Sequence, residues 1–190
     1  MKFTRTAIPD VVIIEPTVFG DERGYFVETF RQDKLNEFLG FDINFTQDNE
    51  SKSSYGVLRG LHYQLAPAAQ TKLVRVIKGK VLDVAVDIRT GSPTFGQHVS
   101  VELSEQNKTQ MLVPRGFAHG FVVLEDDTVF AYKVDNYYSP ENDRGIAFDD
   151  PALGINWQVD KDRLKLSAKD TQQALLANAE VFSIKQNYYA

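Results

Sequence analysis

Short runs in which apolar and polar residues alternate recur along the chain, and they restrict its fold more than any other feature. Only two segments have a helical pattern, namely Gln32–Leu39, which ends at Gly40, and Thr171–Ala179. The runs lie too close together for helical crossovers, so the pattern predicts an all-β antiparallel sandwich or jelly roll with a few short peripheral helices. The predicted strands are Val11–Phe19, Gly24–Phe30, Lys72–Ile77, Lys80–Ile88, Gln97–Leu103, Gln110–Val113, Phe117–Leu124 and Thr128–Asp135.

The run Lys80–Ile88 alternates most regularly. Leu82, Val84, Val86 and Ile88 occupy even positions, whereas Asp83 and Asp87 occupy odd positions. A strand with this pattern is expected to have one buried face and one wetter face.

Length and composition exclude several classes of protein. The chain has 190 residues, which predicts a single domain over 1–190. A net charge of −5 disfavours general nucleic-acid binding, and the lack of cysteine excludes disulfides, thiolate zinc sites and cysteine nucleophiles. The sequence has no apolar stretch typical of a signal peptide or membrane span, so we expect a cytoplasmic protein without a membrane partner.

The chain has three histidines, at His62, His98 and His119. None of them has a second histidine close by in sequence, so a metal site would need ligands from distant segments, and we expect no metal. Histidine is better suited here to carrying protons at neutral pH. For His98, within an alternating run, a structural role is expected.

His62 follows Arg59 and Gly60 in the segment Val57–Gln64. In a regular strand, Arg59 and His62 would point to opposite faces. A bulge at Gly60 would bring both side chains to one face, and glycine tolerates such a bulge. The alternative is a plain strand with a solvated Arg59.

Aromatic and basic residues offer further candidates. Tyr132 fits an ordinary core position, and Tyr138 at a strand end is suited either to packing or to stacking on a nucleobase. Arg23, Arg59 and Lys72 are cations that suit phosphate oxygens. No glycine-rich phosphate loop precedes a helix, so side chains would have to hold a diphosphate.

Long stretches of the chain resemble the dTDP-4-dehydrorhamnose 3,5-epimerase family, from about Ala7 to Asp170. The stretch Pro114–His119 is also similar to the second cupin signature, whereas the metal-binding half of the first signature is missing. The segments that carry the resemblance are Phe19–Phe26, Gln47–Ser53, Gly56–Gln64, Asp83–Gly96, Pro114–Phe121, Tyr132-Lys133, Asn136–Tyr138, Asp149–Pro151, Gly154-Ile155 and Trp157.

The resemblance implies a cupin-type jelly roll that works as a homodimer without a metal or an organic cofactor. It also implies the reaction, which is epimerisation of dTDP-4-dehydro-6-deoxy-D-glucose at carbons 3 and 5 to dTDP-4-dehydro-L-rhamnose, a step toward dTDP-L-rhamnose. Both carbons flank the ketone, so their protons are acidic, because removal of either one gives a stabilised enolate. A base on one face and an acid on the other would then invert each centre.

By the same resemblance, His62 is the base, Asp170 orients it and Tyr132 is the acid. Lys72 would offset the enolate charge at the carbon-4 oxygen. His119 could instead be structural, and Asp170 could be a helix cap. The resemblance assigns substrate contacts to Arg23, Glu28, Gln47, Asn49, Arg59, His119, Tyr138, Lys169 and one carboxylate, for which Asp143 is the better match and Glu141 the alternative.

Several alternatives fit parts of the pattern. An enzyme that epimerises only carbon 3 or carbon 5 would use the same base and acid. A keto-isomerase of the wider cupin group, a metal-dependent cupin oxygenase and a non-catalytic sugar-nucleotide-binding jelly roll are more distant. The N-terminal strand Val11–Phe19 could pair with a neighbouring subunit or be covered within the chain.

Overall fold

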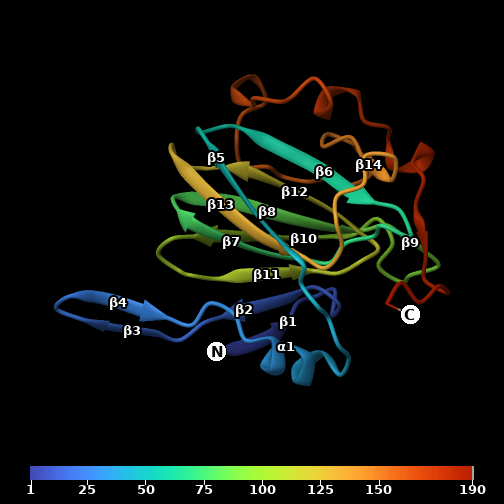
Figure 1. The fold of residues 1–190 in the computed structure, drawn as a ribbon. Helices are drawn as coiled ribbons and strands as arrows, with labels where there is room; N and C mark the ends of the chain where they lie inside the picture. Colours follow the sequence, from blue (N-terminus) through green and yellow to red (C-terminus); the bar gives the residue numbers. More distant parts are fainter. Residues whose placement is uncertain (190) are drawn as a thin grey trace.

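Two antiparallel sheets face one another in the computed structural model, which describes residues 1–189 (Figure 1). The six-stranded sheet has the order β1 (Lys2–Arg5), β2 (Val12–Glu15), β11 (Gln110–Val113), β7 (Lys72–Lys78), β13 (Thr128–Val134) and β5 (Gln47–Ser53). The five-stranded sheet has the order β10 (His98–Ser104), β8 (Lys80–Asp87), β12 (Phe117–Val123), β6 (Leu58–Gln64) and β14 (Asp143–Gly145). The predicted all-β sandwich is therefore confirmed. Within residues 1–189, no helix is long and apolar enough to cross a bilayer.

A two-stranded hairpin leaves the body of the molecule near its N-terminus (Figure 1). It consists of β3 (Val18–Asp21) and β4 (Gly24–Val27), which pair only with each other among the described strands. We call residues 18–27 the arm. The prediction of one continuous strand over Val11–Phe19 is wrong, because β2 ends at Glu15, next to Pro16. Proline has no backbone N–H with which to continue the ladder.

The first predicted helix is present and the second is not. Helix α1 spans Gln32–Leu39, and Gly40 ends it in the left-handed conformation with a φ of 82°. Thr171–Ala179 forms no α-helix. Short 3-10 turns occupy this region, and between them Ala174 accepts a hydrogen bond from the Ala147 amide at 2.8 Å. This backbone pairing to the body outweighs the local helical preference. The 3-10 turns are η1 (Lys161–Arg163), η2 (Asp170–Gln172) and η3 (Leu176–Asn178).

Strand β8 is buried on both faces, so the predicted wetter face is wrong. Asp83 and Asp87 both have 0% exposure. One face of β8 packs into the core between the sheets. The other lies under the C-terminal segment, which contributes Trp157 and Phe182 to the same core cluster and pairs β15 (Phe182–Ser183) with β9 (Arg89–Thr90). Each buried carboxylate has a basic hydrogen-bond partner, as a buried charge requires.

Candidate active site

A cavity of about 560 Å³ lies between the two sheets, and residues of β5 and β6 form part of its wall. Side chains from both sheets and from the segment 165–170 line it. The predicted site residues that it brings together are His62, Lys72, Tyr132, Asp170, Asn49, Arg59 and His119.

A bulge at Gly60 places Arg59 and His62 on the same cavity. On β12, His119 lies opposite His62 and Phe121 opposite Arg59, so three steps on β6 face two steps on β12. Gly60 has a φ of 130°, and a Cβ there would lie 2.5 Å from the Gly120 Cα. Only glycine fits this close approach of two strands. The predicted bulge is therefore confirmed.

His62 and Asp170 form a hydrogen-bonded pair. The His62 Nε2 lies 2.6 Å from the Asp170 Oδ1, and the Ser167 hydroxyl donates to the other carboxylate oxygen at 2.7 Å. Burial alone would raise the pKa of Asp170, but the hydrogen bonds from His62 and Ser167 outweigh it and lower that pKa. Asp170 is therefore an anion that holds the His62 ring, whose Nδ1 has no hydrogen bond within residues 1–189.

Lys72 supplies a buried cation to the cavity, and its pKa is lower than usual for lysine. Its Nζ lies 3.4 Å from the His62 carbonyl oxygen. Burial lowers the pKa of Lys72 from 10.5 to about 8, although the Asp83 charge opposes the change. The ammonium is thus held in a poorly solvated place, where a point charge acts strongly on a neighbouring anion.

Tyr132 reaches the cavity from β13, in the sheet opposite to the one that carries His62. It is partly buried and packs against Phe130, with ring centroids 6.1 Å apart. Burial raises the pKa of Tyr132 despite the positive charge of Arg59, so the phenol stays protonated at neutral pH. A protonated phenol and an imidazole therefore face one cavity from different sheets.

His119 forms a second histidine–carboxylate pair. Its Nε2 lies 2.8 Å from the Asp83 Oδ1, and both residues are buried. Burial lowers the pKa of His119, and the neighbouring Asp83 only partly offsets this effect. His119 thus has both a structural partner and a place in the cavity wall. The other Asp83 oxygen has no hydrogen-bond partner in the part of the chain that the structure describes.

A polar cluster at the C-terminal end of β6 contains three more of the predicted residues. The Tyr138 hydroxyl donates to the Asp143 Oδ2 at 3.0 Å, and Lys169 forms an ion pair with the same oxygen. Asp143 pairs with the end of β6, whereas the Glu141 side chain has no part in these contacts. The geometry therefore favours Asp143 over Glu141.

Gln47 lies beside the cavity, and Arg23 and Glu28 lie away from it. Gln47 donates to the Asn49 Oδ1 at 2.8 Å. Arg23 is at the exposed turn of the arm and pairs with Asp21, while Glu28 lies 3.7 Å from Arg31. Within one chain, the structure does not bring Arg23 or Glu28 to His62.

The site also contains residues that sequence reasoning missed. Ser167 holds Asp170, Asp83 holds His119, and Lys165 lines the cavity beside Arg59. The pattern Ser167-x-x-Asp170 is a local signal that predicts the first contact. Within residues 1–189, no three His, Asp or Glu side chains gather as a potential metal-ligand set.

Comparison with known proteins agrees with this geometry. A family model described as dTDP-4-dehydrorhamnose 3,5-epimerase matches residues 5–178. The enzyme of that name from Shigella flexneri is 53% identical over 182 residues, covering 96% of this chain and 99% of the relative. A 3,5-epimerase from Legionella pneumophila, solved with dTDP-4-keto-L-rhamnose, superposes with a TM-score of 0.93 at 47% identity over 97% of this chain and 99% of that one.

A 3'-monoepimerase from Streptomyces bikiniensis is a more distant neighbour. It superposes with a TM-score of 0.89 at 31% identity, covering 95% of this chain and 92% of the other. The likeness to the Legionella enzyme confirms the predicted cupin-type jelly roll. By the extent of these matches, the chain belongs to the dTDP-4-dehydrorhamnose 3,5-epimerase family.

Proposed function

We propose that this chain inverts carbons 3 and 5 of dTDP-4-dehydro-6-deoxy-D-glucose to give dTDP-4-dehydro-L-rhamnose, in the cytoplasm and on the way to dTDP-L-rhamnose. Family membership supports the reaction, and so does the dTDP-sugar in the Legionella structure. The observation that carries the proposal is that His62 and Tyr132, on opposite sheets, line one cavity. Inversion requires a base on one face of a carbon and an acid on the other.

In the proposed reaction, the His62 Nδ1 removes the proton next to the ketone and the C–H electron pair moves into an enolate. Asp170 accepts a hydrogen bond from Nε2, so its charge stabilises the imidazolium that forms. The Lys72 ammonium offsets the negative charge on the carbon-4 oxygen. Tyr132 then gives its phenolic proton to the opposite face of the carbon. Afterwards His62 releases its proton to solvent and Tyr132 regains one, which restores both groups. The same sequence serves both carbons, because both flank one ketone.

Side chains hold the nucleotide in this proposal. Arg59 and Lys165 line the cavity and are cations that suit a diphosphate. Lys169, which forms an ion pair with Asp143, would supply a third cation. The exposed ring of Tyr138 would stack on the thymine, while Gln47, Asn49 and His119 would make further substrate contacts. Formation of the site from side chains agrees with the lack of a glycine-rich phosphate loop in the sequence.

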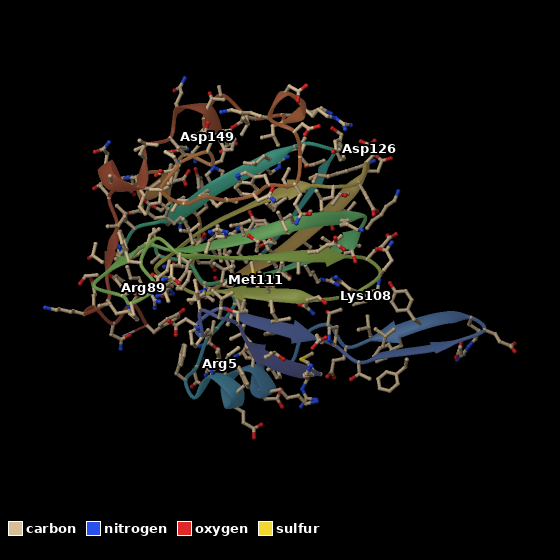
Figure 2. The ribbon with its side chains drawn as sticks, turned by 180° about the vertical axis from the view of Figure 1, so that it is seen from behind. Arg5, Arg89, Lys108, Met111, Asp126 and Asp149 are labelled. Carbon is tan, nitrogen blue, oxygen red and sulfur yellow. The ribbon has the colours of Figure 1, made fainter. Side chains whose placement is uncertain are left out.

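The proposal includes a homodimer, and the arm supports it. Phe19, Tyr25 and Phe26 on the arm are 61%, 61% and 67% exposed, which is unusual for large apolar rings in the absence of a partner. Lys108 (Figure 2) contacts the arm one residue pair from its turn, donating to the Tyr25 hydroxyl at 2.9 Å. A second copy that covers these rings would receive Arg23 and Glu28 near its own cavity. This arrangement explains why both residues lie far from His62 within one chain.

A mono-epimerase is the nearest alternative function. Identity favours the double reaction, since the 3,5-epimerases match at 47% and 53% and the 3'-monoepimerase at 31%. Proton NMR of the purified protein with dTDP-4-dehydro-6-deoxy-D-glucose in deuterated water tests the proposal. We expect deuterium at carbons 3 and 5 and formation of dTDP-4-dehydro-L-rhamnose. Deuterium at one carbon would establish a mono-epimerase, and no exchange by folded protein would favour a binding role.

A further inference from the structure

The last described residues turn back onto the sandwich, beyond the segment that the family model matches. The Tyr189 ring packs on Phe41, with centroids 4.9 Å apart, and the Arg115 guanidinium lies 5.1 Å from its centroid. Tyr188 is anchored separately, because its hydroxyl accepts a hydrogen bond from the Ser183 amide at 2.7 Å. The two neighbouring tyrosines therefore have different partners.

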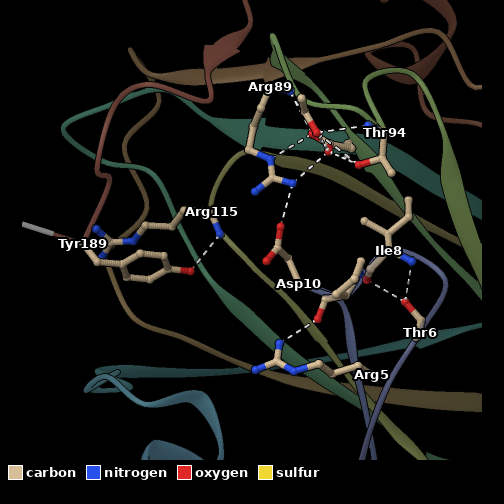
Figure 3. A network of polar contacts seen from close by, with 11 residues as sticks. Arg5, Thr6, Ile8, Asp10, Arg89, Thr94, Arg115 and Tyr189 are labelled. Carbon is tan, nitrogen blue, oxygen red and sulfur yellow. Dashed lines mark hydrogen bonds and ion pairs between the residues drawn. The ribbon is translucent and has the colours of Figure 1, made fainter.

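The Tyr189 hydroxyl closes a ring of four polar residues. It lies 2.7 Å from the Thr71 Oγ1. It also accepts a hydrogen bond from the Arg115 amide at 3.1 Å, which Figure 3 shows. The Asp135 carboxylate completes the ring, accepting from the Thr71 amide at 2.6 Å and from the Arg115 Nε at 3.1 Å. Thr71 has 0% exposure, and Tyr189 is the hydrogen-bond partner of its hydroxyl within residues 1–189.

This ring joins the same ends of three adjacent strands. Thr71 directly precedes β7, Asp135 directly follows β13, and Arg115 lies just beyond the end of β11. The sheet order is β11-β7-β13, so Thr71 is the central member. The first residue of β7 is Lys72, which lies opposite Val113 on one side and Val134 on the other.

Few side-chain contacts hold the Lys72 ammonium, so its position depends mainly on where the backbone of β7 begins. In the described part of the chain, its Nζ has one hydrogen bond, the long 3.4 Å contact to the His62 carbonyl. No carboxylate pairs directly with the ammonium within residues 1–189. A small movement at the start of β7 would therefore move the ammonium or admit water to it.

We infer that Tyr189 is a positioning residue for Lys72, acting through the buried Thr71 hydroxyl. The inference rests on the proposed function for the role of Lys72, although the link between the tail and Lys72 is a property of the folded chain. Removal of the Tyr189 hydroxyl leaves the Thr71 hydroxyl buried without its partner. The start of β7 then loses one of the hydrogen bonds that hold it in place.

Tyr189→Phe tests the inference, with Tyr188→Phe as the matched control. Both variants lose one tyrosine hydroxyl from the tail, and the Tyr188 backbone carbonyl that accepts from Arg115 is retained. We expect kcat to fall roughly tenfold to a hundredfold in Tyr189→Phe with KM changed by less than about twofold, because a misplaced catalytic group weakens the transition state more than binding. Tyr188→Phe should keep wild-type values.

NMR titration of lysines labelled at the ε-carbon gives a second readout that needs no turnover. Lys72→Met identifies the Lys72 signal. The pKa of Lys72, about 8 in the intact site, should rise toward 10.5 in Tyr189→Phe, because water reaches the loosened ammonium. Thr71→Val should reproduce this change, and the Thr71→Val/Tyr189→Phe double variant should add little to it.

The outcomes separate the inference from the proposed function. A Lys72 pKa and a kcat that are both unchanged in Tyr189→Phe would overturn the inference, and so would equal losses in the two tyrosine variants. If the wild-type protein does not act on the dTDP-sugar, the proposed function fails while the NMR titration still decides the link between Tyr189 and Lys72.

Discussion

The His62 Nε2 and the Asp170 Oδ1 lie 2.6 Å apart although 108 residues separate them in sequence. The pair joins β6 of the five-stranded sheet to the C-terminal segment that covers that sheet. The C-terminal segment must therefore fold onto this sheet before Asp170 can orient the proposed base, His62. This explains why Asp170 is buried, with 4% of its side chain exposed, and why Ser167 occupies its second oxygen.

Asp170→Asn should lower kcat roughly 10²- to 10⁴-fold while the protein stays folded. An amide has nearly the same shape but no charge to offset the imidazolium. Steady-state rates on the dTDP-sugar, together with a thermal unfolding curve, measure the effect. Asp149→Asn is the matched control, since it breaks only an exposed ion pair with Lys161 and should leave kcat unchanged. Equal kcat values in the two variants would remove Asp170 from the mechanism.

The rate should depend on the protonation of Lys72. Its pKa in the folded protein is about 8, so the ammonium is present below this pH and is lost as the pH rises through it. We expect kcat to fall above about pH 8. Measured pH profiles of the wild type and Lys72→Met test this. The variant should be much slower, and its rate should not fall further above about pH 8. An alkaline limb that persists in this variant would assign the titration to another group.

Lys72 should also cost the protein stability at neutral pH. Its folded-state pKa of about 8 lies below the ordinary value of 10.5, so between these values the unfolded chain binds more protons. Stability contributed by this site therefore rises with pH across that window. At pH 7, Lys72→Met should unfold at a temperature a few degrees higher than the wild type does, measured by calorimetry. A lower midpoint would show that the ammonium has stabilising partners.

Two inactive variants should complement each other if the arm acts on a second subunit. Arg23→Ala lacks the arm cation but keeps its His62, whereas His62→Ala lacks the base but keeps its Arg23. In randomly mixed dimers, half of the molecules carry one complete site, so about a quarter of the wild-type activity should return. Rates before and after subunit exchange measure this. No recovery in mixtures shown to contain heterodimers would place Arg23 in its own subunit's site.

Gly60→Ala should destabilise the protein by several kcal/mol or prevent folding. The new Cβ would lie 2.5 Å from the Gly120 Cα, at a φ of 130° that only glycine adopts readily. Gly154→Ala is the control, because Gly154 has a φ of 60° and open space around it, and it should cost only about 1 kcal/mol. Urea unfolding compares the two. Similar midpoints would mean that β6 relaxes away from β12.

Periodicity and turn residues were enough to predict most of the fold. Val81 to Asp87 alternates because the two faces of β8 pack on different layers, and this local pattern is visible in the sequence. The burial of Asp83 and Asp87 was not predictable from that pattern. It depends on the six-stranded sheet, which packs against that face of β8, and on partners such as His119 and Arg89.

The site was only partly predictable for a related reason. The Gly60 bulge is a local device, so the sequence indicated that Arg59 and His62 share a face. Whether His62 meets Asp170 depends on contacts across 108 residues, which no local pattern specifies. The failure of the predicted helix over Thr171–Ala179 has the same origin, because the pairing of Ala174 with Ile146 holds that segment in an extended form.

Single-turnover reactions in deuterated water test most directly the claim that His62 and Tyr132 act from opposite faces. In Tyr132→Phe, His62 should still remove a proton and return solvent deuterium to the same face, so recovered substrate carries deuterium with its configuration retained. His62→Asn should give neither exchange nor inversion. Inversion by Tyr132→Phe at the wild-type rate, or exchange by His62→Asn at that rate, would contradict the account.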